Sequence, residues 1–306
     1  MRTILKMLIL TASSLFGGPA AAEELQNCTL VRLAALDMDI DAVGRVTVPM
    51  TMNGHDLKMV VDTGGFITAV TAETAQSLAL AAKIIPMSRI TLFNGDTINH
   101  YTTVEEIKLG NLHASRWDFL LMPQGDSLAG IGGILGPDVL RSYDVEFDFA
   151  NAKLNLYSPD HCGGQVVYWT HDPYAAVPMQ IDYSGHSLVE VQLDGKPVKA
   201  LVDTGAWRTT MELEEAQDLF GEQFAKGLKH DANEEGASTY PFKSLTLEGV
   251  AVNNPDIVLI SRERAKIFAK NWGEPKLIIG MGILRRLHLY IAYREKKLYL
   301  TPASAH

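Results

Sequence analysis

The tripeptide Asp-Thr-Gly occurs twice in this chain of 306 residues, at residues 62–64 and 203–205. Each copy follows a run of apolar residues, so each aspartate ends a stretch that is suited to a buried strand. Two carboxylates brought together cannot both ionise, and one proton is then shared between them. The ionised member can act as a general base on a water molecule while the protonated member polarises a carbonyl group. The pair therefore predicts an acid–base dyad made of Asp62 and Asp203.

The residues after each aspartate are suited to support such a dyad. Glycine lets two backbones approach where a side chain would collide, and threonine can hydrogen-bond across the contact. The alternative is turn chemistry repeated for structural reasons, because all three residue types are common in turns. The apolar strands favour the dyad, since a buried carboxylate without a role is costly. The supporting residues are then Thr63, Gly64, Thr204 and Gly205.

The two motifs belong to an internal duplication. At an offset of 141 (203 − 62), residues 36–78 align with residues 177–219 without a gap. Downstream, Ile-Leu-Gly at residues 134–136 matches Ile-Ile-Gly at residues 278–280, now at an offset of 144 (280 − 136). This period is too long for a solenoid repeat and fits two small lobes.

Strand signals dominate both copies. Apolar and polar residues alternate at residues 189–193, as in a half-buried strand. Asn-Gly at residues 53–54 and Asp-Gly at residues 194–195 are strong hairpin signals. The expected helices are few and short, and they lie after Thr71 and at residues 138–142, 212–220 and 283–287.

These elements predict an all-β protein, mainly β with a few short helices, made of two lobes related by a pseudo-twofold axis. We place the N-terminal lobe at residues 33–158 and the C-terminal lobe at residues 174–302. The linker at residues 159–173 contains proline and a pair of glycines, which is typical of a boundary between lobes.

The N-terminal 22 residues have the pattern of a signal peptide. Arg2 and Lys6 flank an apolar run at residues 4–16, and three alanines at residues 20–22 offer a cleavage site. An uncleaved anchor is the alternative. The sequence therefore predicts export to the periplasm or the medium, with no membrane contact after the signal is removed.

An exported chain with two cysteines is expected to form a disulfide, here between Cys28 and Cys162. Two free buried thiols are the alternative. The net charge of −9 argues against nucleic acid as a partner, because no basic stretch could release counterions. The nine histidines show no metal-ligand spacing, so we expect neither a metal nor a cofactor.

The chain resembles the aspartic proteases, and more closely their retropepsin-like (retroviral-type) branch, with two lobes fused in one chain as in pepsin. The resemblance is carried by the two Asp-Thr-Gly motifs and the two apolar-apolar-Gly segments, and it spans residues 33–302. It implies that Asp62 and Asp203 are catalytic, that hairpins at residues 89–103 and 230–241 are flaps, and that the protein is a monomer.

The sequence departs from the family pattern at several positions. Neither flap has the glycine-rich tip of the retroviral enzymes, Gly282 stands where the first copy has Asp138, and Arg208 has no role that the resemblance supplies. The function expected is an exported aspartic endopeptidase that hydrolyses peptide bonds in extended polypeptide with an Asp/Asp dyad and a bound water. The alternative is a silent or latent protease-like fold that acts as a periplasmic binding or scaffolding module.

Overall fold

The computed structural model describes residues 28–41, 44–85, 90–91, 97–123, 128–261 and 275–303. The predicted signal peptide at residues 1–22 and the tip of the first predicted flap at residues 92–96 lie outside these residues. In the described ranges, none of the helices has the length and apolar character needed to cross a membrane.

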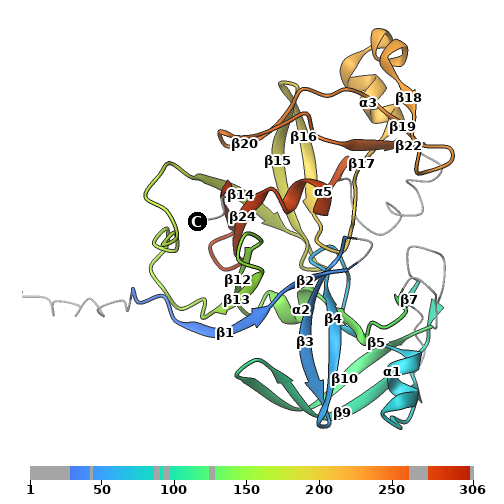
Figure 1. The fold of residues 1–306 in the computed structure, drawn as a ribbon, viewed down its shortest axis with the longest axis vertical. Helices are drawn as coiled ribbons and strands as arrows, with labels where there is room; N and C mark the ends of the chain where they lie inside the picture. Colours follow the sequence, from blue (N-terminus) through green and yellow to red (C-terminus); the bar gives the residue numbers. More distant parts are fainter. Residues whose placement is uncertain are drawn as a thin grey trace, which may run out of the picture.

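The first lobe is built around a sheet of eight strands that curls back on itself (Figure 1). The strand β3 closes this sheet because it pairs with β9 as well as with β4. In sheet order the strands are β2 (Asp39–Ile40), β3 (Val46–Met52), β4 (His55–Val61), β11 (Gly133–Leu135), β5 (Ala69–Thr71), β10 (Leu112–Met122), β9 (His100–Leu109) and β6 (Lys83–Ile84).

The second lobe repeats this arrangement inside a larger sheet of fifteen strands. The strand β15 pairs with β16 and also with β20, as β3 pairs with β4 and β9 in the first lobe. The strands of this lobe are β15 (Ser187–Leu193), β16 (Lys196–Val202), β23 (Leu277–Ile279), β17 (Thr209–Glu212), β22 (Ile257–Ile260), β19 (Ser238–Thr239), β18 (Lys229–His230), β20 (Ser244–Leu247) and β21 (Val250–Asn253).

Six strands from both copies continue the same sheet between the lobes. Their centre is the antiparallel pair β12–β24, which joins the first copy to the second through Glu146 and Tyr290. Figure 1 shows β12, β13, β14 and β24 beside one another between the two lobes. In sheet order these strands are β1 (Arg32–Asp37), β13 (Lys153–Tyr157), β12 (Asp144–Asp148), β24 (Leu287–Ala292), β25 (Lys297–Pro302) and β14 (Ala175–Ile181).

Turns and helices follow the sequence closely. Asn53 and Gly54 have φ values of 49° and 81°, and Asp194 and Gly195 have 46° and 78°, so both pairs form the left-handed turns expected of such hairpins. Thr71 caps the first helix, where its hydroxyl accepts the backbone N–H of Thr74. The helices are α1 (Ala72–Ser77), α2 (Pro137–Leu140), α3 (Leu213–Phe220) and α5 (Met281–Leu284), with a 3-10 helix at Glu222–Gly227. The helix α5 begins at Met281, two residues before the predicted start at residue 283. It must fit between the end of β23 at Ile279 and the start of β24 at Leu287, so it cannot extend to residue 287 as predicted.

One hydrophobic core runs through both lobes and the sheet between them. It contains Met59 of β4 and Val202 of β16, and between the lobes it contains Phe147 of β12 and Leu289 of β24. Because the core is continuous, the approach strands of both Asp-Thr-Gly motifs are held in one packed body.

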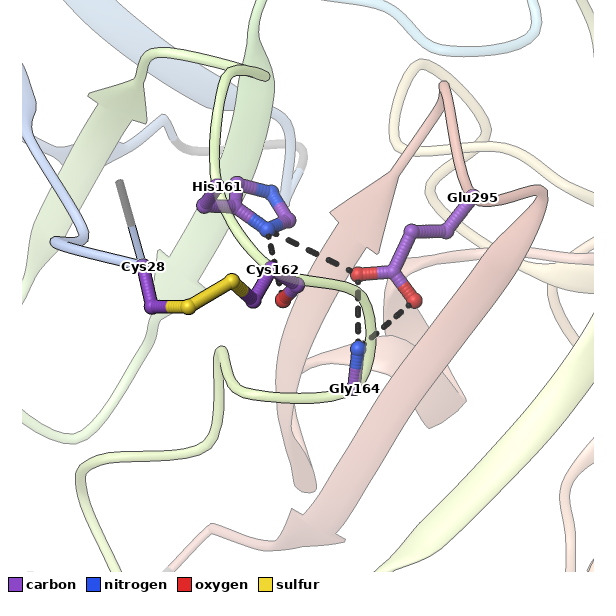
Figure 2. The surroundings of a disulfide bond; sticks show 5 residues. All are labelled: Cys28, His161, Cys162, Gly164 and Glu295. Atoms are coloured by element: carbon purple, nitrogen blue, oxygen red, sulfur yellow. Dashed lines mark hydrogen bonds and ion pairs between the residues drawn. A yellow bond between two sulfur atoms is a disulfide. The ribbon is translucent and has the colours of Figure 1, made fainter. Parts of the chain in front are cut away.

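The linker is fastened to both lobes and to the N-terminal segment. Cys28 and Cys162 form the expected disulfide, with their Cα atoms 4.6 Å apart. His161 Nε2 lies 2.6 Å from Asp144 Oδ2 on β12. Figure 2 shows Glu295, in the turn between β24 and β25, accepting hydrogen bonds of 3.1 Å from the backbone N–H of Gly164.

Reducing this disulfide is expected to lower the stability of the protein. The bond spans 134 residues of sequence, and the chain-entropy model gives at most about 5 kcal/mol for a loop of that length. Thermal unfolding with and without reductant measures the effect. A Cys28→Ser, Cys162→Ser double variant is the control, and its melting temperature should not respond to reductant. An equal melting temperature for reduced and oxidised wild type would contradict this prediction.

Candidate active site

The two aspartates end equivalent strands at the contact between the lobes. Asp62 follows β4, which pairs in parallel with β11, and its backbone N–H donates to the carbonyl of Leu135 at 3.0 Å. Asp203 follows β16, which pairs in parallel with β23, and its N–H donates to the carbonyl of Ile279, also at 3.0 Å. The apolar-apolar-Gly segments recognised in the sequence are thus the strands that align the two motifs.

The two threonines of the motifs exchange hydrogen bonds across this contact. Thr204 Oγ1 donates to the carbonyl of Val61 at 2.7 Å and accepts the backbone N–H of Thr63 at 3.1 Å. In the opposite direction, Thr63 Oγ1 donates to the carbonyl of Val202 at 2.8 Å and accepts the N–H of Thr204 at 3.0 Å. Both side chains are fully buried. Four buried bonds therefore hold the two motif loops in one relative position.

Each motif glycine leaves room for the carboxyl group of the other lobe. A Cβ atom on Gly64 would lie 2.3 Å from Cγ of Asp203, and one on Gly205 would lie 2.4 Å from Cγ of Asp62. These separations are far below any allowed carbon–carbon contact. The glycines are thus required for the approach of the two carboxyl groups.

Replacing Gly64 with alanine is expected to separate the two carboxyl groups and to destabilise the fold. Forcing a methyl group into a packed site costs about 1–3 kcal/mol, which denaturant unfolding can measure. Gly163→Ala is the matched control, because a Cβ atom there would meet nothing nearer than Glu295 at 3.8 Å. Wild-type stability for Gly64→Ala would show that this close approach does not exist.

The two carboxyl groups hydrogen-bond to each other in a desolvated site. Asp203 is only 7% exposed. Burial raises the pKa of Asp62 and raises that of Asp203 well above its ordinary value, and the charge of Asp62 raises the pKa of Asp203 further. Backbone donors limit the rise, since Gly64 donates to Asp62 Oδ1 at 3.0 Å and Gly205 to Asp203 Oδ1 at 2.8 Å. Such a pair holds a proton well above the pH at which an isolated carboxyl group would lose it.

The two lobes differ in how they support the motif loops. In the first lobe, Asp138 accepts hydrogen bonds from the backbone N–H and the hydroxyl of Thr68, at 2.8 and 2.7 Å. In the second lobe Gly282 takes the place of that aspartate. Thr209 accepts the N–H of Gly280 at 3.1 Å, as Thr68 accepts the N–H of Gly136 at 2.9 Å in the first lobe. The substitution seen in the sequence therefore removes one carboxylate from the second loop and leaves its threonine in the same role.

The second predicted flap is tied to the second motif loop by an ion pair that the sequence did not indicate. Its strands β18 and β19 form a short antiparallel hairpin. Arg208 donates two parallel hydrogen bonds, of 2.9 and 2.7 Å, to Asp231, which directly follows β18 in the loop of this hairpin. The hydrogen bond with Arg208 lowers the pKa of Asp231 to about 2. The equivalent position in the first lobe is Ile67 (208 − 141), so this link belongs to the second lobe.

The first predicted flap is described only at its base, where β7 (Ile90–Thr91) pairs with β8 (Thr97–Ile98). The aromatic residues Phe66 and Trp207 occupy equivalent positions, four residues after each aspartate, and they are 46% and 51% exposed. Within the ranges that the structure describes, no three His, Cys, Asp or Glu side chains are grouped so that they could hold a metal ion.

Comparison with known families agrees with this geometry. Residues 48–142 match the family described as "gag-polyprotein putative aspartyl protease", and residues 189–283 match the family described as "Aspartyl protease". The two matches together cover more than half of the chain, and each contains one Asp-Thr-Gly motif. The protein belongs to the aspartic proteases, with two retropepsin-like domains in tandem.

A solved structure with the same fold is that of basic 7S globulin from soybean. The two proteins are 10% identical and superpose with a TM-score of 0.55, over 90% of this chain and 98% of the globulin. At this identity the likeness concerns the fold alone. None of the curated proteins matches the sequence.

Proposed function

We propose that this protein is an exported aspartic endopeptidase that cleaves peptide bonds in extended polypeptide. The observation that carries the proposal is the pair Asp62 and Asp203, whose carboxyl groups are hydrogen-bonded in a desolvated contact between two rigidly joined loops. Perturbed titration of paired carboxyl groups is typical of catalytic sites. A turn repeated for structural reasons alone would not need two carboxyl groups buried against each other.

In the mechanism that we infer, Asp203 holds the shared proton and Asp62 is ionised. Asp62 removes a proton from a water molecule, whose oxygen attacks the carbonyl carbon of the scissile bond, while Asp203 donates its proton to the carbonyl oxygen. The resulting gem-diol breaks down when Asp62 returns the proton to the leaving amine and a hydroxyl proton goes back to Asp203. The two carboxyl groups end in the states in which they began.

Two features support an extended polypeptide with apolar side chains as substrate. Phe66 and Trp207, each four residues after an aspartate of the pair, expose apolar surface. The hairpin of β18 and β19 has backbone groups that could pair with a strand-like substrate. Export is supported by the signal-like N-terminal segment and by the disulfide. We infer that the mature protein begins after residue 22 and acts as a monomer, because one chain supplies both aspartates.

The test is cleavage of a denatured-protein or peptide library by the chain without residues 1–22, scanned from acid to neutral pH. We expect cleavage between apolar residues, with inhibition by a statine-type mimic of the gem-diol. If no peptide is cleaved at any pH, the endopeptidase proposal is wrong and the binding or scaffolding alternative stands.

A further inference from the structure

The duplication places a basic residue at the same position in each copy, 17 residues before the aspartate. These residues are Arg45 and His186, related by the offset of 141 (186 − 45). Each is bound by the aspartate four residues before it: Arg45 Nε donates to Asp41 Oδ2 at 2.6 Å, and His186 Nδ1 lies 2.9 Å from Asp182 Oδ2. In both turns the other carboxylate oxygen accepts the backbone N–H of the basic residue. The turn is thus built to hold a side chain that can carry positive charge.

The turn that carries His186 reaches across to the other lobe. The side chain is 1% exposed, and its Nε2 lies 2.9 Å from the carbonyl oxygen of Gly65, in the loop that carries Asp62. A Cβ atom on Gly65 would lie 2.9 Å from Asp62 Oδ2. His186, in the second lobe, therefore contacts the backbone of Gly65, and the carboxyl group of Asp62 packs against that same residue.

The partners of His186 define its protonation state. The carbonyl oxygen of Gly65 can only accept, so Nε2 must carry a hydrogen. Asp182 Oδ1 accepts the backbone N–H groups of Ser184 and His186 at 2.8 and 3.0 Å. A carboxylate also only accepts, so Nδ1 carries a hydrogen as well. With both bonds made, His186 is an imidazolium.

The charged groups around this imidazolium come from three elements. Asp182 lies in its own turn, and Asp62 lies in the loop that it contacts. Arg141, at the end of α2, approaches the turn at Gly185, where a Cβ atom would lie 3.8 Å from the guanidinium. The positive charge of His186 lowers the pKa of Asp62 and thereby opposes the effect of burial. The equivalent position in the first copy carries another cation, Arg45, which donates to Asp41 in its own turn.

We propose that His186 is a positioning residue of the dyad: its imidazolium fixes the Asp62 loop from the opposite lobe and favours the ionised form of Asp62. This inference rests on the proposed endopeptidase function, and it adds a residue outside the two Asp-Thr-Gly motifs that acts on the dyad. The effect is electrostatic, so it predicts a change in pH dependence that a packing role would not produce.

The test compares pH–activity profiles of wild type, His186→Gln and His186→Arg. The neutral amide can still donate to Gly65, but without the positive charge both limbs of the profile should move to higher pH. His186→Arg restores the cation with the residue that the first copy carries, so its limbs should coincide with those of wild type. His55→Gln, at the exposed histidine that begins β4, is the matched control.

A second readout does not depend on turnover. The carboxyl carbon of Asp62, followed by NMR against pH, should titrate at higher pH in His186→Gln than in wild type, and both ring nitrogens of His186 should be protonated in wild type at acid pH. Unshifted titration of Asp62, or a ring nitrogen without hydrogen, would overturn the inference even in an active enzyme. Absence of turnover in wild type with a shifted Asp62 titration would instead overturn the endopeptidase proposal alone.

Discussion

Replacing Asp62 or Asp203 with asparagine is expected to reduce peptide turnover by about 10⁴-fold, with the fold unchanged. An amide cannot take the proton of the water molecule, nor can it give and receive a proton in turn with its partner. The change nearly preserves the size of the side chain, and the threonine bonds that join the loops do not involve either carboxyl group. The loss should therefore appear in kcat, without a loss of thermal stability.

The double variant is expected to be little worse than either single variant, because the two carboxyl groups act as one unit. Asp172→Asn is the matched control, since Asp172 is an exposed linker residue. Turnover by all variants should be followed with one peptide across the pH range. Losses that multiply in the double variant would show that the two aspartates act independently, and unimpaired turnover in a single variant would remove the dyad from the mechanism.

The same variants carry a consequence for stability. Burial raises the pKa of Asp203 well above the ordinary value of 3.8. As pH rises, Asp203 therefore loses its proton more readily in the unfolded chain than in the folded protein, and this difference lowers the free energy of unfolding. Asp203→Asn has no such penalty. Its stability relative to wild type should therefore grow as pH rises from about 4 towards neutral, and unfolding curves at two pH values would detect the difference.

The meeting of Asp62 and Asp203 at the contact between the lobes could be predicted from sequence, because its determinants are local and occur twice. An apolar strand, a turn signal before it and the Asp-Thr-Gly motif lie within about ten residues of one another in each copy, and the duplication implies a common environment. The partner strand was recognisable for the same reason, as residues 134–136 match residues 278–280. The disulfide followed from the number of cysteines and the signal-like N-terminus.

The contacts of His186 and Arg208 were harder to predict, because their partners are distant in sequence. His186 contacts Gly65 across 121 residues, and Arg208 pairs with Asp231 across 23. One signal was nevertheless present. Asp182 and His186 repeat the spacing of Asp41 and Arg45 at the offset of 141, and a comparison of the two copies for charged pairs would have found them.

The sheet between the lobes shows a different limit of sequence analysis. Alternation of apolar and polar residues in β12 places Asp144 and Glu146 on a solvent face, yet both are fully buried. The alternation rule assumes that one face of a strand meets water. Here Tyr168 of the linker and His288 of β24 contact the side chain of Glu146 on that face, and nothing within β12 itself indicates these contacts.

Glu146 is the centre of this buried face, and its loss is expected to have the largest effect on stability. Its Oε1 lies 2.9 Å from His288 Nε2 on β24, in the second copy. Its Oε2 accepts hydrogen bonds from Asn155 at 2.6 Å, Tyr157 at 3.2 Å and Tyr168 of the linker at 2.8 Å. One carboxylate therefore joins the first copy, the linker and the second copy.

Glu146→Ala is expected to destabilise the protein by about 3–5 kcal/mol, because it leaves several buried donors without an acceptor. Glu146→Gln keeps the shape and an acceptor oxygen, so its cost should be smaller. Glu190→Ala, at an exposed position of β15, is the matched control and should change stability by less than about 0.5 kcal/mol. Denaturant unfolding gives the three values. If Glu146→Ala proved no more costly than Glu190→Ala, the contact between the copies would depend on apolar packing alone. Glu146→Ala could instead lower the free energy of unfolding by the expected amount and also lose turnover. If a bound ligand or a lower temperature then restored turnover, the sheet between the lobes would be shown to hold the two aspartates in position.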